Sequence, residues 1–379
     1  DRSVSRGLGD VYKRQNLYHI TEKRKSMTIE ELLITAKENK ASDVHITVGL
    51  PPKMRINGIL VDMDYPRLLP PDTEAVISTM MSDKRLQQFE ELGEIDFSYS
   101  IPQIGRYRVN VFHQRGSMAA SIRLVSTKIP LPEELGIPKS VVDLYQKKRG
   151  LVLVTGPTGS GKSTTLASII DRINSMREVH VITLEDPIEY LHNHKKAMVN
   201  QREVGLDTHS YSNALRAALR EDPDVILVGE MRDLETISTA ITAAETGHLV
   251  LSTLHTIGAA STIDRIVDVF PPHQQQQIRV QLSMVLESVI SQQLIPTADK
   301  KSRVAAFEVM HSTPAIKNLI REAKSPQINS TIQTSKKLGM QTMDDAIFDL
   351  YMKGDIDKEN AVSYAQDSQI MEKRIDNAF

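Results

Sequence analysis

The chain has 379 residues, 40% of them hydrophobic and 25% charged, which favours two to three globular domains with ordinary buried cores. Its 46 Lys and Arg residues nearly balance 48 Asp and Glu residues, so the net charge of -2 gives no global attraction to nucleic acid or to an anionic membrane. The absence of cysteine excludes disulfides, thiolate zinc sites and cysteine nucleophiles, and no apolar run reaches the roughly 18 residues of a transmembrane helix.

Residues 1–26 differ in character from the rest of the chain. They are polar and basic, they lack periodicity, and no apolar signal-peptide core follows their charges. A helical pattern then begins at Met27, with Ile29, Leu32 and Leu33 on one face. We predict a disordered or non-native leader at residues 1–26, and the alternative is a basic tail that touches a membrane or a partner.

Residues 27–127 are typical of a small α+β domain. Strand patterns at residues 44–46 and 54–56 flank a Gly-Leu-Pro-Pro turn signal. Apolar and polar residues alternate at residues 107–111 and again at 122–124, and the glycine between these two runs predicts a hairpin.

A proline-rich stretch marks the end of this domain. Residues 128–138 contain Pro130, Pro132 and Pro138, which are unsuited to a helix interior, so we predict an extended linker. Beyond it, residues 139–379 change to a repeating pattern of strand, loop and helix.

Short apolar runs rich in β-branched residues follow the linker, at residues 151–155, 179–184, 225–228 and 249–252. With helical patterns between several of them, these runs predict the buried parallel strands of an α/β sheet. One amphipathic helix is predicted next, ending before Pro296, and the region from about residue 297 to 379 is expected to be helical. The apolar face of that amphipathic helix consists of Ile278, Leu282, Val285 and Val289.

The segment after the first of these strands matches the P-loop signature G-x-x-x-x-G-K-[ST]. Its residues are Gly156, Pro157, Thr158, Gly159, Ser160, Gly161, Lys162 and Ser163, and Thr164 opens an amphipathic helix directly after them. This strand-loop-helix context argues against an ordinary glycine-rich turn. Backbone amides and the helix N-terminus would hold the phosphates of ATP, Lys162 would reach the β- and γ-phosphates, and Ser163 would bind Mg²⁺.

Acidic residues follow two of the predicted strands at the point where each strand ends. Glu185, Asp186 and Glu189 come after the second strand, and Glu230 follows the third. Because open α/β sheets bind ligands at the carboxyl ends of their strands, we expect these carboxylates to line the nucleotide site. Glu230 would order Mg²⁺, with Gly229 permitting close approach, and the alternative is that these are solvated loop charges.

Two histidines, His248 and His255, bracket the fourth predicted strand. A lone histidine is usually a structural residue, so this pair by itself is only a moderate signal. No Ser-His-Asp arrangement can be derived from the spacing.

Together, these motifs resemble the secretion ATPases of type II secretion and type IV pili, and within them the pilus retraction ATPases. The resemblance extends over nearly all of residues 27–375. The similar segments are residues 41–52, 156–164, 182–189, 222–233, 246–256 and 338–342. The resemblance implies an α/β fold, with a RecA-like P-loop motor domain, a smaller PAS-like α+β N-terminal domain and a helical C-terminal region.

The resemblance also implies roles for single residues. Glu189 would activate water and Glu230 would order Mg²⁺, while His248 and His255 would sense or stabilise the phosphate end of ATP.

Two arginines are candidates for action between subunits. Arg108 and Arg123 lie at polar positions of adjacent predicted strands, and the resemblance implies that they reach a neighbouring subunit's ATP as arginine fingers. The alternative is a pair of ordinary surface arginines.

The implied assembly is a homohexamer that hydrolyses ATP with Mg²⁺ to drive pilus disassembly and twitching motility. It would act in the cytoplasm, at the face of the inner membrane, on the pilus platform protein, with a paralogous retraction ATPase as a further partner. Neither nucleic acid nor membrane insertion is expected. Lys317 departs from the family pattern, because it replaces the first arginine of a retraction-linked motif at residues 315–321. Lysine keeps the positive charge but lacks the planar guanidinium group of arginine, which can donate two parallel hydrogen bonds.

Alternative functions remain open at this point. An extension or secretion motor is the nearest, although such proteins typically carry an additional N-terminal domain and often a four-cysteine metal insertion. A nucleotide-binding accessory subunit of the retraction machinery is a second alternative, and a nucleic-acid translocase is a third.

Overall fold

The structure is a computed structural model, and its described residues are 27–56, 58–102, 104–125 and 128–378. The leader predicted at residues 1–26 lies outside them. The chain divides into two compact units, the first ending at Val125 and the second beginning at Ser126. Each unit has a sheet and a hydrophobic core of its own.

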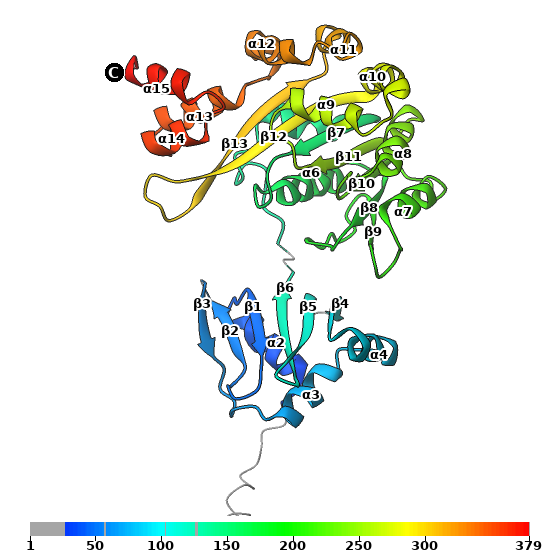
Figure 1. Cartoon of the computed structure of the whole chain (residues 1–379), viewed down its shortest axis with the longest axis vertical. Helices are drawn as coiled ribbons and strands as arrows, with labels where there is room; N and C mark the ends of the chain where they lie inside the picture. Colours follow the sequence, from blue (N-terminus) through cyan, green and yellow to red (C-terminus); the bar gives the residue numbers. More distant parts are fainter. Residues whose placement is uncertain (1–26, 57, 103, 126–127, 379) are drawn as a thin grey trace, which may run out of the picture. The chain divides into compact units, whose positions relative to one another are not determined.

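The first unit is built on an antiparallel sheet. Among its described residues, six strands pair in the order β3-β2-β1-β6-β5-β4 (Figure 1). The strands are β1 (Asp43–Ile46), β2 (Lys53–Ile56), β3 (Ile59–Asp62), β4 (Glu94–Ile101), β5 (Gly105–Gln114) and β6 (Ser117–Leu124). The helices are α2 (Ile29–Glu38), α3 (Pro70–Ser78) and α4 (Asp83–Leu92). The strands predicted within β1 and β2 and the hairpin of β5 and β6 are confirmed, whereas β3 and β4 were not predicted.

Helix α2 illustrates how the sequence forms this core. Thr28 Oγ1 accepts a hydrogen bond from Glu31 N at 3.2 Å, and Glu31 Oε2 accepts one from Thr28 N at 3.3 Å, so the pair caps the helix. The predicted apolar face of α2 then buries Ile29, Leu32 and Leu33 in one cluster with the sheet.

The second unit is built on a mixed sheet. In the described part of this unit, the strands pair in the order β13-β12-β7-β11-β10-β8-β9, and all neighbours are parallel except β12 and β13. The strands are β7 (Gly150–Thr155), β8 (His180–Glu185), β9 (Met198–Glu203), β10 (Val225–Val228), β11 (Leu249–Leu254), β12 (Leu286–Pro296) and β13 (Arg303–His311). The four predicted parallel strands correspond to β7, β8, β10 and β11.

Helices accompany this sheet along the whole second unit (Figure 1). They are α5 (Lys139–Val142), α6 (Lys162–Met176), α7 (Tyr211–Ala218), α8 (Leu234–Glu245), α9 (Ala259–Asp268), α10 (Pro272–Val285), α11 (Pro314–Arg321), α12 (Ile328–Thr334), α13 (Met343–Met352), α14 (Lys358–Tyr364) and α15 (Ser368–Asp376), with short 3-10 helices η1 (Asp143–Gln146), η2 (Ser325–Gln327) and η3 (Lys336–Leu338). None of the helices in the described ranges combines the length and the apolar character that a membrane crossing requires.

Alternate residues of β7 face opposite sides of the sheet. Val152 and Val154 pack in a cluster with α5 and α6, whereas Leu151 and Leu153 pack in a cluster with α7, α8, α9 and α10. Because every residue of β7 is buried, the loop that leaves its carboxyl end starts from the middle of the core.

Two predicted helical regions differ from the structure. Helix α10 ends at Val285, and Val289 lies on β12 instead of continuing the helix. The strand pairs in parallel with β7 and antiparallel with β13, so tertiary pairing overrides a local spacing that also fits a helix. For the same reason the region after residue 297 is not wholly helical, since β13 precedes its helices.

The predicted linker also differs from an extended chain. Residues 132–136 form turns, and Pro132 and Ile137 are buried. Ile137 joins Val141 and Leu144 in a core cluster of the second unit. The prolines keep this segment out of a helix, but its apolar side chains attach it to the second unit.

Candidate active site

The P-loop connects β7 to α6. Gly156, Gly159 and Gly161 have φ angles of 142°, 77° and 90°, in the region that favours glycine. At Gly156, a Cβ would lie 2.2 Å from the carbonyl oxygen of Gln292 on β12. The loop therefore passes too close to the neighbouring strand for a side chain at this position.

Lys162 is the first residue of α6 and is buried. Its Nζ donates hydrogen bonds to Gly156 O at 2.9 Å and to Pro157 O at 3.0 Å. Burial lowers the pKa of Lys162, and the negative charges of Glu230 and Glu189 oppose this shift. The ammonium group is thus held at the P-loop, close to two carboxylates, where a phosphate could replace the loop carbonyls as its partner.

A pocket beside Lys162 gathers most of the predicted site residues. Those that line it are Thr158, Gly159, Lys162, Ser163, Glu185, Asp186, Glu189, Glu230 and His255. The other predicted P-loop residues do not line this pocket: Gly156, Pro157, Ser160 and Gly161 form the turn, and Thr164 lies in the first turn of α6. The P-loop and the carboxyl ends of β8, β10 and β11 therefore converge as the sequence predicts.

Glu230 is half-buried just after β10. Its Oε1 lies 3.0 Å from Nε2 of His255, and its Oε2 accepts an ion-pair contact of 2.7 Å from Nη2 of Arg232. Burial opposes ionisation, but the contacts with Arg232 and His255 hold the pKa of Glu230 below its ordinary value. An ionised carboxylate therefore faces the pocket.

The donor set of the pocket fits Mg²⁺. Ser163 contributes a hydroxyl and Glu230 a carboxylate, and Mg²⁺ prefers oxygen ligands of these kinds. Within the ranges that the structure describes, no three His, Asp or Glu residues form a metal cluster. A hydroxyl and a carboxylate suit a cation that nucleotide phosphates and water would also hold.

The segment after β8 brings three further carboxylates to the pocket. Glu185 ends the strand and accepts hydrogen bonds from Thr183 Oγ1 at 2.6 Å and Gln201 Nε2 at 3.0 Å. Desolvation raises the pKa of Glu185, although these hydrogen bonds oppose the shift. Asp186 and Glu189 are exposed, so the Glu189 carboxylate is accessible to water in the pocket.

The sequence patterns missed Tyr190, His192 and Tyr211, which also line the pocket. The Tyr190 hydroxyl lies 2.9 Å from Thr164 Oγ1, and burial lowers the pKa of His192 to about 4. Burial, with nearby carboxylates, raises the pKa of Tyr211. Proximity to the acidic segment could have indicated Tyr190 and His192, but no sequence signal marks Tyr211.

Gly229 also lines the pocket, and its missing side chain is needed for packing. A Cβ at this position would lie 2.8 Å from the Tyr211 hydroxyl and 3.1 Å from Leu184 O. The missing side chain thus makes room for Tyr211 on α7, and the predicted close approach of Mg²⁺ to Gly229 stays a prediction.

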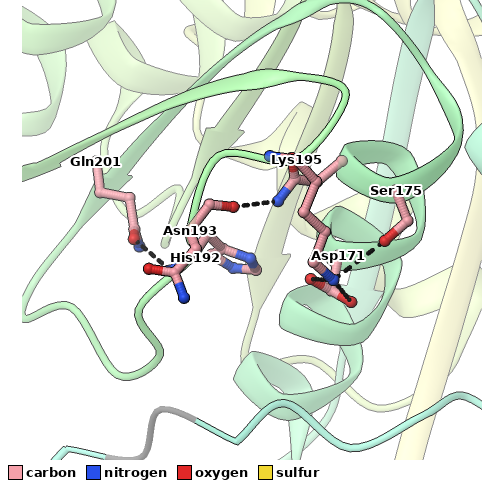
Figure 2. A network of polar contacts seen from close by, with 7 residues as sticks. Asp171, Ser175, His192, Asn193, Lys195 and Gln201 are labelled. Atoms are coloured by element: carbon pink, nitrogen blue, oxygen red, sulfur yellow. Dashed lines mark hydrogen bonds and ion pairs between the residues drawn. The ribbon is translucent and has the colours of Figure 1, made fainter.

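The loop that follows Glu189 is tied to α6 (Figure 2). Lys195 Nζ contacts both carboxylate oxygens of Asp171 at 2.7 and 2.8 Å and Ser175 Oγ at 3.1 Å. Asn174 Nδ2 donates to Asn193 O at 2.7 Å. Since α6 begins with Lys162, one helix connects the phosphate lysine with the anchor of this loop.

Of the two histidines expected to sense or stabilise the phosphate end, the structure places His255 at the pocket and His248 away from it. His255 follows the carboxyl end of β11, whereas His248 precedes its amino end, where its carbonyl accepts from Gly150 N. A strand of this length separates the two residues by about 20 Å. The His248 imidazole instead contacts Ala243 O through Nδ1 at 2.9 Å, which is a structural role at the end of α8.

Arg108 and Arg123 belong to the first unit. They are direct cross-strand partners on β5 and β6, and both are exposed, as the alternation predicts. Arg123 Nε lies 2.9 Å from Oδ1 of the buried Asp43, yet 70% of the Arg123 side chain remains exposed.

Comparisons with known proteins agree with this arrangement. The family described as type II/IV secretion system protein matches residues 22–375. The "Type IV pilus retractation ATPase PilT" of Pseudomonas aeruginosa is 52% identical over 88% of this chain and 97% of its own length. A "Twitching motility protein" of Neisseria gonorrhoeae is 48% identical over 84% of this chain and 86% of its own. The crystal structure of the pilus retraction motor PilT with bound ADP has a TM-score of 0.86 at 51% identity, covering 92% of this chain and 100% of that chain.

Proposed function

Since the chain belongs to the type II/IV secretion system protein family, we propose that it is the ATPase that powers pilus retraction and twitching motility. The observation that carries this proposal is the convergence of Lys162, Glu189 and Glu230 on one pocket at the P-loop. ATP hydrolysis requires a lysine that binds phosphate, a carboxylate that holds the metal ion and a carboxylate that activates water.

The residues divide the chemistry among them. Backbone amides of the P-loop and the Lys162 ammonium group bind the β- and γ-phosphates, and Ser163 and Glu230 hold Mg²⁺, which neutralises phosphate charge when bound. Glu189 accepts a proton from the attacking water, because its carboxylate is exposed in the pocket. His255 keeps Glu230 in place through their 3.0 Å contact.

We further propose that each site is completed by a neighbouring subunit of a homohexamer. Arg108 and Arg123 are exposed cationic side chains and direct cross-strand partners in the first unit. From a neighbouring subunit they would stabilise charge on the transferred phosphoryl group, a contribution worth about 10³–10⁵ in rate in other systems. The ring would act on a pilus platform protein at the cytoplasmic face of the inner membrane.

Deletion of the gene separates retraction from its alternatives. Cells without the gene should become hyperpiliated and stop twitching, because pili assemble but are not withdrawn. Complementation with the wild-type gene should restore twitching, and complementation with a Glu189→Gln variant should not.

Two other outcomes would contradict the proposal. Cells without pili would indicate an extension motor. Full twitching with the Glu189→Gln variant would indicate a nucleotide-binding accessory subunit whose own turnover is not needed.

A further inference from the structure

Gln201, which lies outside the P-loop and the acidic motifs, forms hydrogen bonds with the segment that carries Glu189. Gln201 lies on β9, the edge strand beside β8, and its register partner is Thr183. The segment between these two strands carries Glu189. Gln201 contacts the last residue of β8, Glu185, and two residues of the segment, Tyr190 and His192. Figure 2 shows Gln201 directed toward the backbone of His192.

The contacts of Gln201 engage both the nitrogen and the oxygen of its amide. Nε2 donates to Glu185 Oε1 at 3.0 Å and to Tyr190 O at 2.9 Å, while Oε1 accepts from His192 N at 2.8 Å. A primary amide has two N–H donors, and here both are engaged together with the carbonyl oxygen. The three partners lie on both sides of Glu189 in the chain.

A second residue of β9 supports the same segment. Glu203 is buried and its Oε2 accepts from Ile188 N, the residue before Glu189, at 3.0 Å. Because side chains two residues apart share one face of a strand, Gln201 and Glu203 approach the segment from the same face of β9.

The far side of the segment is fixed to α6. The Tyr190 hydroxyl contacts Thr164 in the first turn of this helix, and the Lys195–Asp171 ion pair contacts it two turns further on. Glu189 therefore sits on a backbone that is restrained from β9 on one side and from the helix of Lys162 on the other.

We propose that Gln201 is a positioning residue for ATP hydrolysis, which sets the Glu189 carboxylate against the attacking water by fixing the backbone on both sides of it. This inference rests on the proposed role of Glu189 as the group that accepts the proton of water. Gln201 itself does not line the pocket, so its effect is on the placement of Glu189 and not on nucleotide binding. A displacement of about 1 Å in a reacting group can lower a rate by about 10²-fold.

The test compares Gln201→Met with the wild-type protein. Methionine keeps the length of the side chain but removes all three hydrogen bonds. We expect kcat for Mg-ATP hydrolysis to fall by about 10- to 100-fold, while the Kd for ATP and the KM change by less than about twofold. Gln341→Met is the matched control, because Gln341 also donates to a backbone carbonyl, Phe307 O at 2.8 Å, but lies away from the pocket.

A second variant guards against loss of folding. Gln201→Glu keeps the shape and the acceptor for His192 N but loses both donated hydrogen bonds, and it should lower kcat without changing the Kd for ATP. Thermal unfolding of each variant verifies that it is folded.

The inference fails if a folded Gln201→Met or Gln201→Glu protein hydrolyses ATP at the wild-type rate, or if the loss appears in the Kd for ATP and not in kcat. The failure of the proposed role of Glu189 looks different, because Glu189→Gln would then keep full turnover whatever Gln201 does. The failure of the proposed function in retraction would appear in the cells that lack the gene, whatever the kcat of the Gln201 variants.

Discussion

At the scale of single residues, the site depends on how burial and charge act on each side chain. Lys162 and Glu230 are both withdrawn from solvent, which disfavours their charged forms. Glu230 nevertheless stays ionised because Arg232 and His255 contact it, and Lys162 has two carboxylates nearby. Glu189 has no such burial and keeps access to water, which fits the different roles proposed for it and for Glu230.

His192 provides a prediction at this scale. Burial lowers its pKa from 6.5 to about 4, with Asp171 opposing the shift and Lys195 reinforcing it. Between these values the unfolded chain binds more protons than the folded chain. The free energy of unfolding should therefore fall as the pH drops from about 6.5 toward 4, by up to about 1.4 kcal/mol per pH unit from this residue, and level off below.

The measurement is urea unfolding of the wild-type protein and of His192→Gln across that pH range. Other groups titrate in both proteins, so the relevant quantity is the difference between the two curves. The wild-type protein should lose about 3 kcal/mol more than the variant. Curves that run parallel would show that His192 is not held neutral by the fold.

At the scale of elements, sequence patterns predicted correctly those helices, strands and turns whose structure depends on interactions between neighbouring residues in the chain. The P-loop, the four parallel strands and α6 follow from short signals that the structure confirms. The continuation of α10 as β12 was not predictable in this way, because Val289 fits a helical spacing and only pairing with β7 makes it a strand.

Topology explains the remaining successes and failures at the site. Carboxylates that follow parallel strands meet at one edge of the sheet, and Glu185 and Glu230 do so. The same rule places His248, which precedes β11, at the opposite edge of the sheet from His255. Tyr211 reaches the pocket from α7, and nothing local in the sequence indicates that.

The turn of the P-loop gives a prediction for an element. Gly156→Ala would bring a Cβ to 2.2 Å from Gln292 O, so either β12 or the loop must move. Gly354→Ala is the control, since Gly354 also has a positive φ of 79° but nothing lies within 4 Å of the place that a Cβ would take there. The control should cost about 1–2 kcal/mol of unfolding free energy. Gly156→Ala should cost more and also weaken ATP binding, as measured by urea unfolding and nucleotide titration, and equal effects of the two substitutions would contradict the close approach.

At the scale of the whole molecule, the two units carry different parts of the proposed mechanism. The second unit holds the P-loop, the carboxylates and His255, and the first unit carries Arg108 and Arg123 on adjacent strands. The buried Asp43 is the partner of Arg123 on the neighbouring strand β1. Burial opposes its ionisation, but contacts with Ser42 and Arg123 hold the pKa of Asp43 below the ordinary value. An ionised Asp43 thus orients Arg123 while most of that side chain stays exposed for a partner.

Mixing of two inactive variants tests whether subunits share a site. The Lys162→Ala protein should not bind the phosphates of ATP, and the Arg108→Ala protein should not supply an arginine to the neighbouring subunit. A ring made of either variant alone should therefore be inactive. In an equal mixture, about a quarter of the interfaces would combine an intact Lys162 with an intact Arg108. Hydrolysis should therefore return to about a quarter of the wild-type rate. A mixture that stays inactive after confirmed subunit exchange, or an Arg108→Ala ring with wild-type turnover, would exclude this sharing.

The most direct test of the central claim, that Glu189 activates water beside a nucleotide held by Lys162, is Mg-ATP binding and hydrolysis by purified Glu189→Gln. Glu178→Gln, which changes an exposed glutamate outside the pocket, is the control and should behave as the wild-type protein. We predict that Glu189→Gln binds ATP with wild-type affinity but hydrolyses it at least about 100-fold more slowly. Wild-type turnover by Glu189→Gln would contradict the account.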